Sequence, residues 1–218
     1  MKLKDIERGE TFAFGDSEWL VLEHDDTGHT LALSKDIIDF MPFDTENKNN
    51  WAESSLRKYL NGDYLDKLCE GAEPEKLGFA PYHLDLTADD GLKDYGITTD
   101  FIFLLTCDLY RKNRDVIEPI GKWWWLATAY SAYASNSYFS RGVRTDGTLN
   151  DSYAYYGNRG VRPACYLDSN ILVSNSDAEV DEAINAAEKF LQLDDRQRES
   201  VLDYIDFLIA KGAEKNEP

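Results

Sequence analysis

The stretch KWWWLATAYSAYASNSYFSRGVRTDGTLNDSYAYYGNRGVRPACYL, residues 122–167, contains the features that decide the fold. It opens with three adjacent tryptophans, Trp123–Trp125, and adjacent side chains on a strand point to opposite faces. The Asp146-Gly147 pair suits the tight turn of a hairpin. Residues 161–167 predict a closing strand that is entered through Pro163. We therefore expect antiparallel strands that carry a polar, tyrosine-rich surface between structured flanks.

Composition limits the function classes. The chain has 218 residues, 43% hydrophobic content and a net charge of −18, which argues against binding nucleic acid or an anionic membrane surface. It has no apolar run of about 18 residues, so we expect no transmembrane helix and no membrane insertion. Residues 1–7 lack the apolar region of a secretory signal, so we expect a cytoplasmic protein, with association to a phage left open.

The charge is spread unevenly. Residues 122–175 carry five basic and three acidic side chains, whereas the segments on either side are strongly acidic. Electrostatic repulsion of a ligand is weakest over this nearly neutral segment. We therefore expect a ligand to bind there.

The rest of the chain predicts an α+β organisation. We expect strands at 11–14, 18–23, 30–33 and 101–105, a helix over 50–70 that breaks at 61–63 before an Asp63 cap, and a short helix or turn over 108–116. Residues 71–100 indicate an irregular, partly ordered loop. The domain should cover 1–175, followed by a helical hairpin over 176–212, which starts at a capping box, and a disordered tail over 213–218.

Seven motifs, in this order, resemble those of a domain family of uncharacterised function that is common in gut Firmicutes and their phages. They are Gly9–Gly15, Glu18–Leu22, Leu33–Ile37, Trp51–Gly62, Lys122–Leu126, Val143–Asn150 and Arg159–Ala164. The resemblance covers roughly residues 6–173. One departure is that Ala127-Thr128 stands where the family often has Arg-Ser.

That family is similar to the C-type-lectin-like fold, which formylglycine-generating enzymes and the variable proteins of diversity-generating retroelements share. The resemblance implies a twisted antiparallel sheet with two helices, the first and last strands paired, and a loop-rich region that displays a ligand face. The helical hairpin lies outside the resemblance. The retroelement analogy further implies that the Tyr/Ser/Asn positions are diversified, because randomising the adenines of Asn codons yields that set of residues.

A non-catalytic binding module is the function that we expect. Tyrosine offers a large, stiff contact area at low entropic cost, and Ser, Asn and Gly add adaptable hydrogen bonds. Arginine offers paired donors to a carboxylate and stacks on aromatic rings. The expected ligand-binding residues are Trp124, Tyr130, Tyr133, Asn136, Tyr138, Arg141, Arg144, Asn150, Tyr153, Tyr155, Tyr156 and Asn158. The expected ligand is an unknown protein, peptide or glycan, and the C-terminal helices leave a homodimer open.

Two other readings remain as alternatives. An oxidase resembling formylglycine-generating enzymes needs a pair of reactive cysteines that bind copper, and Cys69, Cys107 and Cys165 are widely spaced with no activating neighbour. A structural component of a phage or cell-surface assembly is the second. Glu118-Pro119-Ile120 resembles the Glu-Pro-Asn type of calcium-lectin motif, but Ile120 removes a ligand. We therefore expect no catalytic residues, no metal site and no cofactor.

Overall fold

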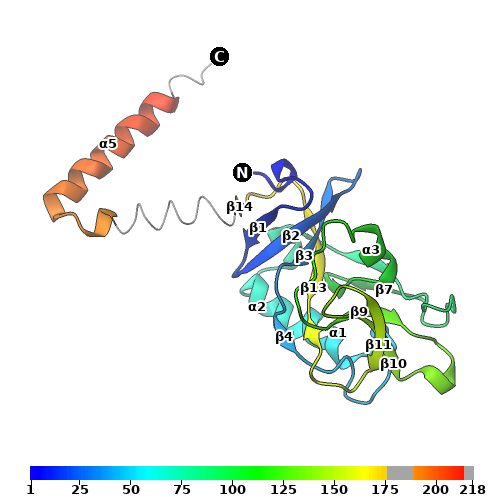
Figure 1. Ribbon diagram of the computed structural model, residues 1–218. Coiled ribbons are helices and arrows are strands. Elements are labelled where there is room, and N and C mark those ends of the chain that lie inside the picture. The colour runs from blue at the N-terminus through cyan, green and yellow to red at the C-terminus, as the bar shows by residue number, and fades with distance from the viewer. Residues whose placement is uncertain (176–188, 214–218) are drawn as a thin grey trace. The chain divides into compact units, whose positions relative to one another are not determined.

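The computed structural model describes residues 1–175 and 189–213, and the chain divides into two compact units, 1–174 and 175–218 (Figure 1). The first unit combines curled, mostly antiparallel sheets with a few short helices, which confirms the mixed α and β composition expected from the sequence.

The larger sheet forms the base of the first unit. Its strands are β1 (Thr11–Phe14), β2 (Ser17–His24), β3 (His29–Ser34), β5 (Phe79–Ala80), β8 (Ile102–Leu104), β13 (Pro163–Asp168) and β14 (Ser174–Asn175). Their order is β14-β1-β2-β3-β13-β5, and β8 also pairs with β13. The strands expected at 11–14, 18–23, 30–33 and 101–105 are confirmed. Trp19 and Leu20 of β2 are neighbours in regular register and so point to opposite faces, and both are buried, so both faces of this strand are covered.

The second sheet carries the tyrosine-rich segment. Its strands are β4 (Asp39–Phe40), β9 (Trp124–Ala129), β10 (Phe139–Val143), β11 (Leu149–Tyr153) and β12 (Gly160–Val161), in the order β11-β10-β9-β12-β4. The expected hairpin is confirmed, since β10 pairs with β11 and Gly147 in its turn has φ of +82°. In Figure 1, β10 and β11 lie at the end of the first unit away from β1 and β14.

Gly160 lets two strands approach closely. It pairs in parallel with Trp124, and its N–H donates to the carbonyl of Trp123 at 2.7 Å. A Cβ atom at Gly160 would lie 3.0 Å from that carbonyl oxygen and would overlap the side chain of Ile37. Only glycine fits this junction without displacing β9.

Short helices cover the sheets. They are the 3-10 helices η1 (Leu3–Asp5), η2 (Trp51–Glu53), η4 (Pro74–Leu77) and η5 (Ala134–Asn136), the π-helical turn η3 (Leu60–Tyr64), and α1 (Ser55–Tyr59), α2 (Leu65–Cys69) and α3 (Cys107–Lys112). The predicted break is confirmed, because Gly62 leaves the helical region at φ −115° and ψ −109°. The predicted Asp63 cap is wrong: α2 starts two residues later, after Tyr64, which makes no side-chain capping bond.

Residues 71–100 are more ordered than the sequence indicates. They include β6 (Tyr82–Asp85), which pairs with β7 (Ile97–Asp100). Leu84 is buried, and so is Asp100, whose carboxylate accepts hydrogen bonds from Trp51 and Arg57. The expectation of an irregular loop is therefore wrong, because polar side chains that face inward hide the apolar alternation on which the prediction relied.

In the second unit, α5 spans Asp195–Ala213. The start of α5 is capped, since the carboxylate of Asp194 accepts the N–H of Gln197 at 2.8 Å. The first helix of the predicted hairpin falls largely on residues 176–188, and the predicted tail largely on 214–218; both ranges lie outside the described residues. Within the described part of the chain, no helix has the length and apolar character needed to cross a bilayer.

Candidate functional site

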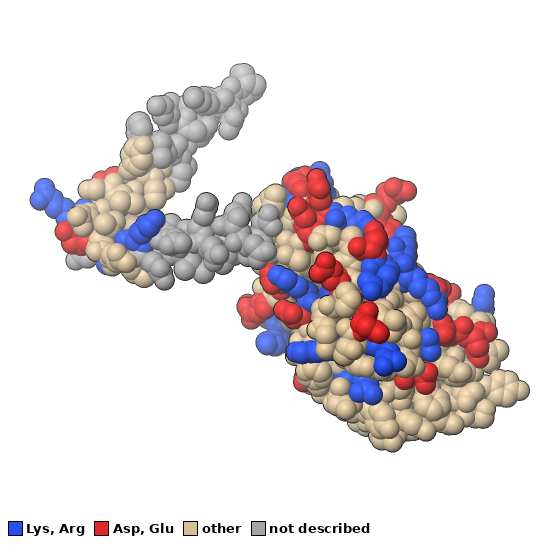
Figure 2. All heavy atoms as spheres, in the orientation of Figure 1, with Lys and Arg blue, Asp and Glu red and all other residues tan. Residues whose placement is uncertain are grey.

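Six tyrosines form what we call the tyrosine surface: Tyr130, Tyr133, Tyr138, Tyr153, Tyr155 and Tyr156. Tyr138 is half-buried and the other five are exposed, Tyr133 most of all at 68% and Tyr155 at 49%. Figure 2 shows few charged atoms at the end of the first unit where β10 and β11 lie. The structure therefore places the six predicted tyrosines outside the fully buried core.

Four rings of the tyrosine surface touch one another, those of Tyr138, Tyr153, Tyr155 and Tyr156, while Tyr130 contacts Phe139. Tyr153, at the end of β11, lies 4.5 Å from Phe139, 5.8 Å from Tyr138 and 5.6 Å from both Tyr155 and Tyr156, measured between ring centroids. Tyr155 and Tyr156 meet edge to face at 4.8 Å. Such contacts restrict ring motion before any ligand arrives, which lowers the entropic cost of binding.

Asn49 holds the loop that carries Tyr133 and Tyr138, and the ring of Tyr138 contacts that of Tyr153. Its side chain is fully buried, and its Nδ2 group donates to the carbonyls of Ser131, Asn136 and Phe139 at 2.9, 3.2 and 2.8 Å. Its Oδ1 atom accepts the hydroxyl of Tyr95 at 2.7 Å. A single amide thus ties both ends of the 131–139 loop to the segment before η2. No pattern in the sequence signals this role, because the three carbonyl groups lie more than 80 residues away along the chain.

Arg141, which the sequence predicts to contact a ligand, forms ion pairs within the domain. Its side chain is only 14% exposed, and its guanidinium lies 3.3 Å from the carboxylate of Asp89 and 3.7 Å from that of Asp151. It also lies 6.0 Å from the ring centroid of Tyr130. Arg141 therefore packs against Tyr130 while two carboxylates hold its guanidinium in place.

Trp124, which the sequence predicts to contact a ligand, is buried in the core. It is 2% exposed and packs against Tyr110 and the buried guanidinium of Arg162, at 5.7 and 5.2 Å. The alternation of the three tryptophans does not expose it because both faces of β9 are covered. Trp123, just before β9, is the member of the triplet that remains partly exposed.

The other candidates lie at the surface. Arg144 and Asn158 are exposed, and Asn136 and Asn150 are half-buried. Asn158 accepts a hydrogen bond from Arg159 at 2.9 Å.

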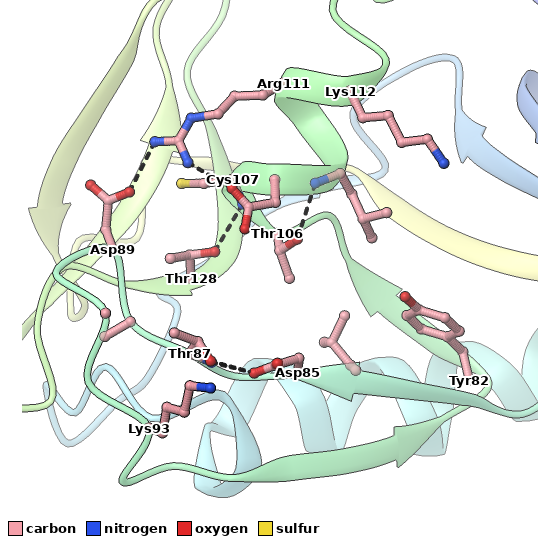
Figure 3. A pocket seen from close by; sticks show the side chains of 15 residues that line it. Tyr82, Asp85, Thr87, Asp89, Lys93, Thr106, Cys107, Arg111, Lys112 and Thr128 are labelled. Carbon is pink, nitrogen blue, oxygen red and sulfur yellow. Dashed lines mark hydrogen bonds and ion pairs between the residues drawn. The ribbon is translucent and has the colours of Figure 1, made fainter.

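A cleft of about 530 Å³ opens between β6 and its following loop, α3, and Thr128 of β9 (Figure 3). Part of the charge on its rim is paired: Arg111 binds Asp89 at 3.0 Å and Asp108 at 2.8 Å, and Lys112 binds Glu23 at 2.6 Å. Asp89 also forms an ion pair with Arg141, whose guanidinium lies near the ring of Tyr130. Asp89 therefore links the cleft to the tyrosine surface. Sequence reasoning missed this cleft because one wall comes from the segment expected to be an irregular loop.

A family of domains of unknown function, DUF6273, matches residues 27–169. The chain belongs to the DUF6273 family. This membership confirms that a domain family of uncharacterised function covers this part of the chain, inside the range of the resemblance seen in the sequence. No curated protein and no solved structure matches the chain.

The thiols of this DUF6273 protein are held away from solvent. Cys69, Cys107 and Cys165 are all buried and form no disulfide. Burial raises the pKa of each thiol, including that of Cys107 beside the cleft. Within residues 1–175 and 189–213, no three His, Cys, Asp or Glu side chains are grouped so as to hold a metal ion.

Proposed function

We propose that this DUF6273 protein is a non-catalytic recognition module that binds a protein, peptide or glycan ligand through the tyrosine surface. The observation that carries the proposal is that the exposed rings of Tyr153, Tyr155 and Tyr156 pack on one another beside the 131–139 loop, which the buried amide of Asn49 anchors. Rigid, amphipathic rings next to small polar side chains make the kind of surface that antibodies use.

The fold that we propose is C-type-lectin-like. Two features support it: β1 lies beside β14 at one edge of the larger sheet, and a long excursion between β3 and β13 carries the second sheet and the loops. Exposed Tyr, Ser and Asn positions on such a scaffold also suit diversification by a retroelement. A near-identical template copy beside the encoding DNA would support that refinement.

The alternative oxidase gains no support from the thiols. Copper chemistry on paired cysteines needs accessible thiolates, whereas burial raises the pKa of Cys69, Cys107 and Cys165 and so lowers the thiolate population.

A combined glycan and peptide array tests the proposal. The test variant is Tyr133→Ser/Tyr155→Ser/Tyr156→Ser, because these side chains are exposed and their loss leaves the core intact. The control is Ile97→Ser/Leu172→Ser, which removes two exposed apolar side chains elsewhere on the same unit.

We expect the tyrosine variant to lose at least about tenfold in affinity for the strongest array ligand, since aromatic anchors dominate binding energy. The control should bind as the wild type does. Equal binding by all three proteins would refute the proposal.

A further inference from the structure

Three cations gather on aromatic rings next to the tyrosine surface. Arg159 lies 4.5 Å from the ring centroid of Trp123 and 5.6 Å from that of Tyr156, and Arg144 lies 5.7 Å from Trp123. Lys122 lies 5.6 Å from the ring of Phe40, which is 46% exposed. We call these residues the basic aromatic patch: Phe40, Lys122, Trp123, Arg144, Tyr156 and Arg159.

Strand register explains why the patch forms. β9 lies between β10 and β12, with Val143 paired to Trp124 on one side and Gly160 paired to Trp124 on the other. Residues one step along, Arg144 and Arg159, therefore flank Trp123 from the two neighbouring strands. The two guanidinium carbons are at most about 10 Å apart, because both lie close to the same ring centroid.

None of the three cations is neutralised by an ion pair. Among the described residues, no carboxylate oxygen lies within 4 Å of the charged nitrogens of Lys122, Arg144 or Arg159, although the chain carries 41 acidic side chains. Arg159 donates only to neutral oxygens, those of Ser152 and Asn158.

The acidic residues nearest the patch in sequence make hydrogen bonds of their own but keep their charge, and the pKa of Asp146 is lowered by its hydrogen bonds from Thr148 and by the charge of Arg144. Asp39 accepts the N–H of Phe40, and Asp146 accepts the N–H and hydroxyl of Thr148. Remote carboxylates are screened beyond about 10 Å at 0.1 M salt. The patch therefore presents three cations that no described carboxylate holds in an ion pair, although the chain as a whole carries a net charge of −18.

A guanidinium stacked on a ring keeps its N–H groups in a plane that suits a carboxylate. In an extended peptide, side chains two residues apart are about 7 Å apart and lie on the same face. This spacing lies within the limit set for the two guanidinium groups. Tyr156 belongs to both the patch and the tyrosine surface, so a peptide bound at one would continue onto the other.

We propose that the basic aromatic patch binds the carboxylates of an acidic, extended polypeptide segment whose neighbouring residues contact the tyrosine surface. This inference rests on the proposed recognition function and names the chemistry of its partner. A peptide is favoured over a glycan because tyrosine-rich surfaces with small polar spacers suit protein ligands.

Fluorescence anisotropy with a labelled (Glu-Gly)5 peptide tests the inference, with (Gln-Gly)5 and (Lys-Gly)5 as comparison peptides. The test variant is Arg144→Gln/Arg159→Gln. The control is Lys58→Gln/Lys67→Gln, which removes the same charge from two exposed lysines on α1 and α2. Thermal unfolding of every variant checks that the fold is kept.

We expect the wild type to bind only the Glu peptide, and more weakly as sodium chloride rises. The arginine variant should lose about tenfold or more in affinity, and the lysine control should not change. Failure of the wild type to bind the Glu peptide, or an equal loss in both variants, would overturn the inference. Binding of polyuronate in its place, with the same arginine dependence, would overturn the assignment to a peptide.

The two proposals fail separately. If the arginine variant keeps full affinity for the strongest array ligand while the tyrosine variant loses it, the recognition function stands and the acidic partner is wrong. If the tyrosine variant keeps all binding, the recognition function itself is wrong, and the acidic partner falls with it.

Discussion

Replacing Asn49 by alanine tests how the tyrosine surface is held in place. The change removes two amide protons that are shared among the carbonyls of Ser131, Asn136 and Phe139, and it removes the acceptor of the Tyr95 hydroxyl. Each lost hydrogen bond costs about 1 kcal/mol, and a buried carbonyl left without a donor adds about 1–3 kcal/mol. We expect the free energy of unfolding to fall by about 3 kcal/mol.

Two measurements separate a local effect from a general one. Urea denaturation gives the loss of stability, and hydrogen exchange followed by mass spectrometry reports on the 131–139 loop. We expect faster exchange there under native conditions, because local opening no longer has to break the anchoring bonds.

Asn61→Ala is the matched control. Asn61 donates to the carbonyls of Arg57 and Ile102 and accepts the N–H groups of Phe101 and Ile102, so its loss also removes several bonds. It should lower stability without loosening the 131–139 loop. A loss below about 1 kcal/mol in Asn49→Ala, or the same exchange pattern in both variants, would refute the anchoring role.

Two further predictions concern the core. Gly160→Ala should lower the free energy of unfolding by about 1–3 kcal/mol in urea denaturation, because the new methyl group meets the Trp123 carbonyl and the Ile37 side chain. Gly157→Ala is the control and should be nearly neutral, because its methyl group has room. Equal stabilities of the two variants would show that the junction is not tight. At pH 8 the three thiols should react slowly with Ellman's reagent in the native protein and rapidly in denaturant. Burial raises the pKa of each thiol in the native protein and leaves little thiolate at that pH. Fast labelling of any one thiol in the native state would contradict this prediction.

Local patterns in the sequence predicted the parts of the fold that depend on neighbouring residues. The Asp146-Gly147 turn and the break at Gly62 follow from backbone preferences that the residues carry with them. The exposure of Tyr133 and Tyr155 follows from their polar surroundings, which offer no apolar stripe to bury.

Contacts between residues far apart in sequence could not be predicted in this way. Asn49 and Arg141 act through partners that only the folded chain brings near, so the sequence suggested no role for the first and the wrong role for the second. Trp124 was misassigned because alternation along a strand predicts two faces but does not reveal that both are covered. The cleft was not predicted for a related reason: its wall at Leu84 belongs to β6, which is ordered by pairing with β7.

Tyrosine footprinting tests the central claim most directly. The protein is oxidised by hydroxyl radicals alone and with its strongest array ligand bound, and the modified tyrosines are quantified by mass spectrometry. We predict protection at Tyr133, Tyr155 and Tyr156, and no change at Tyr82, which lines the cleft. Protection at Tyr82 with Tyr155 and Tyr156 unchanged would place the ligand in the cleft and contradict the account.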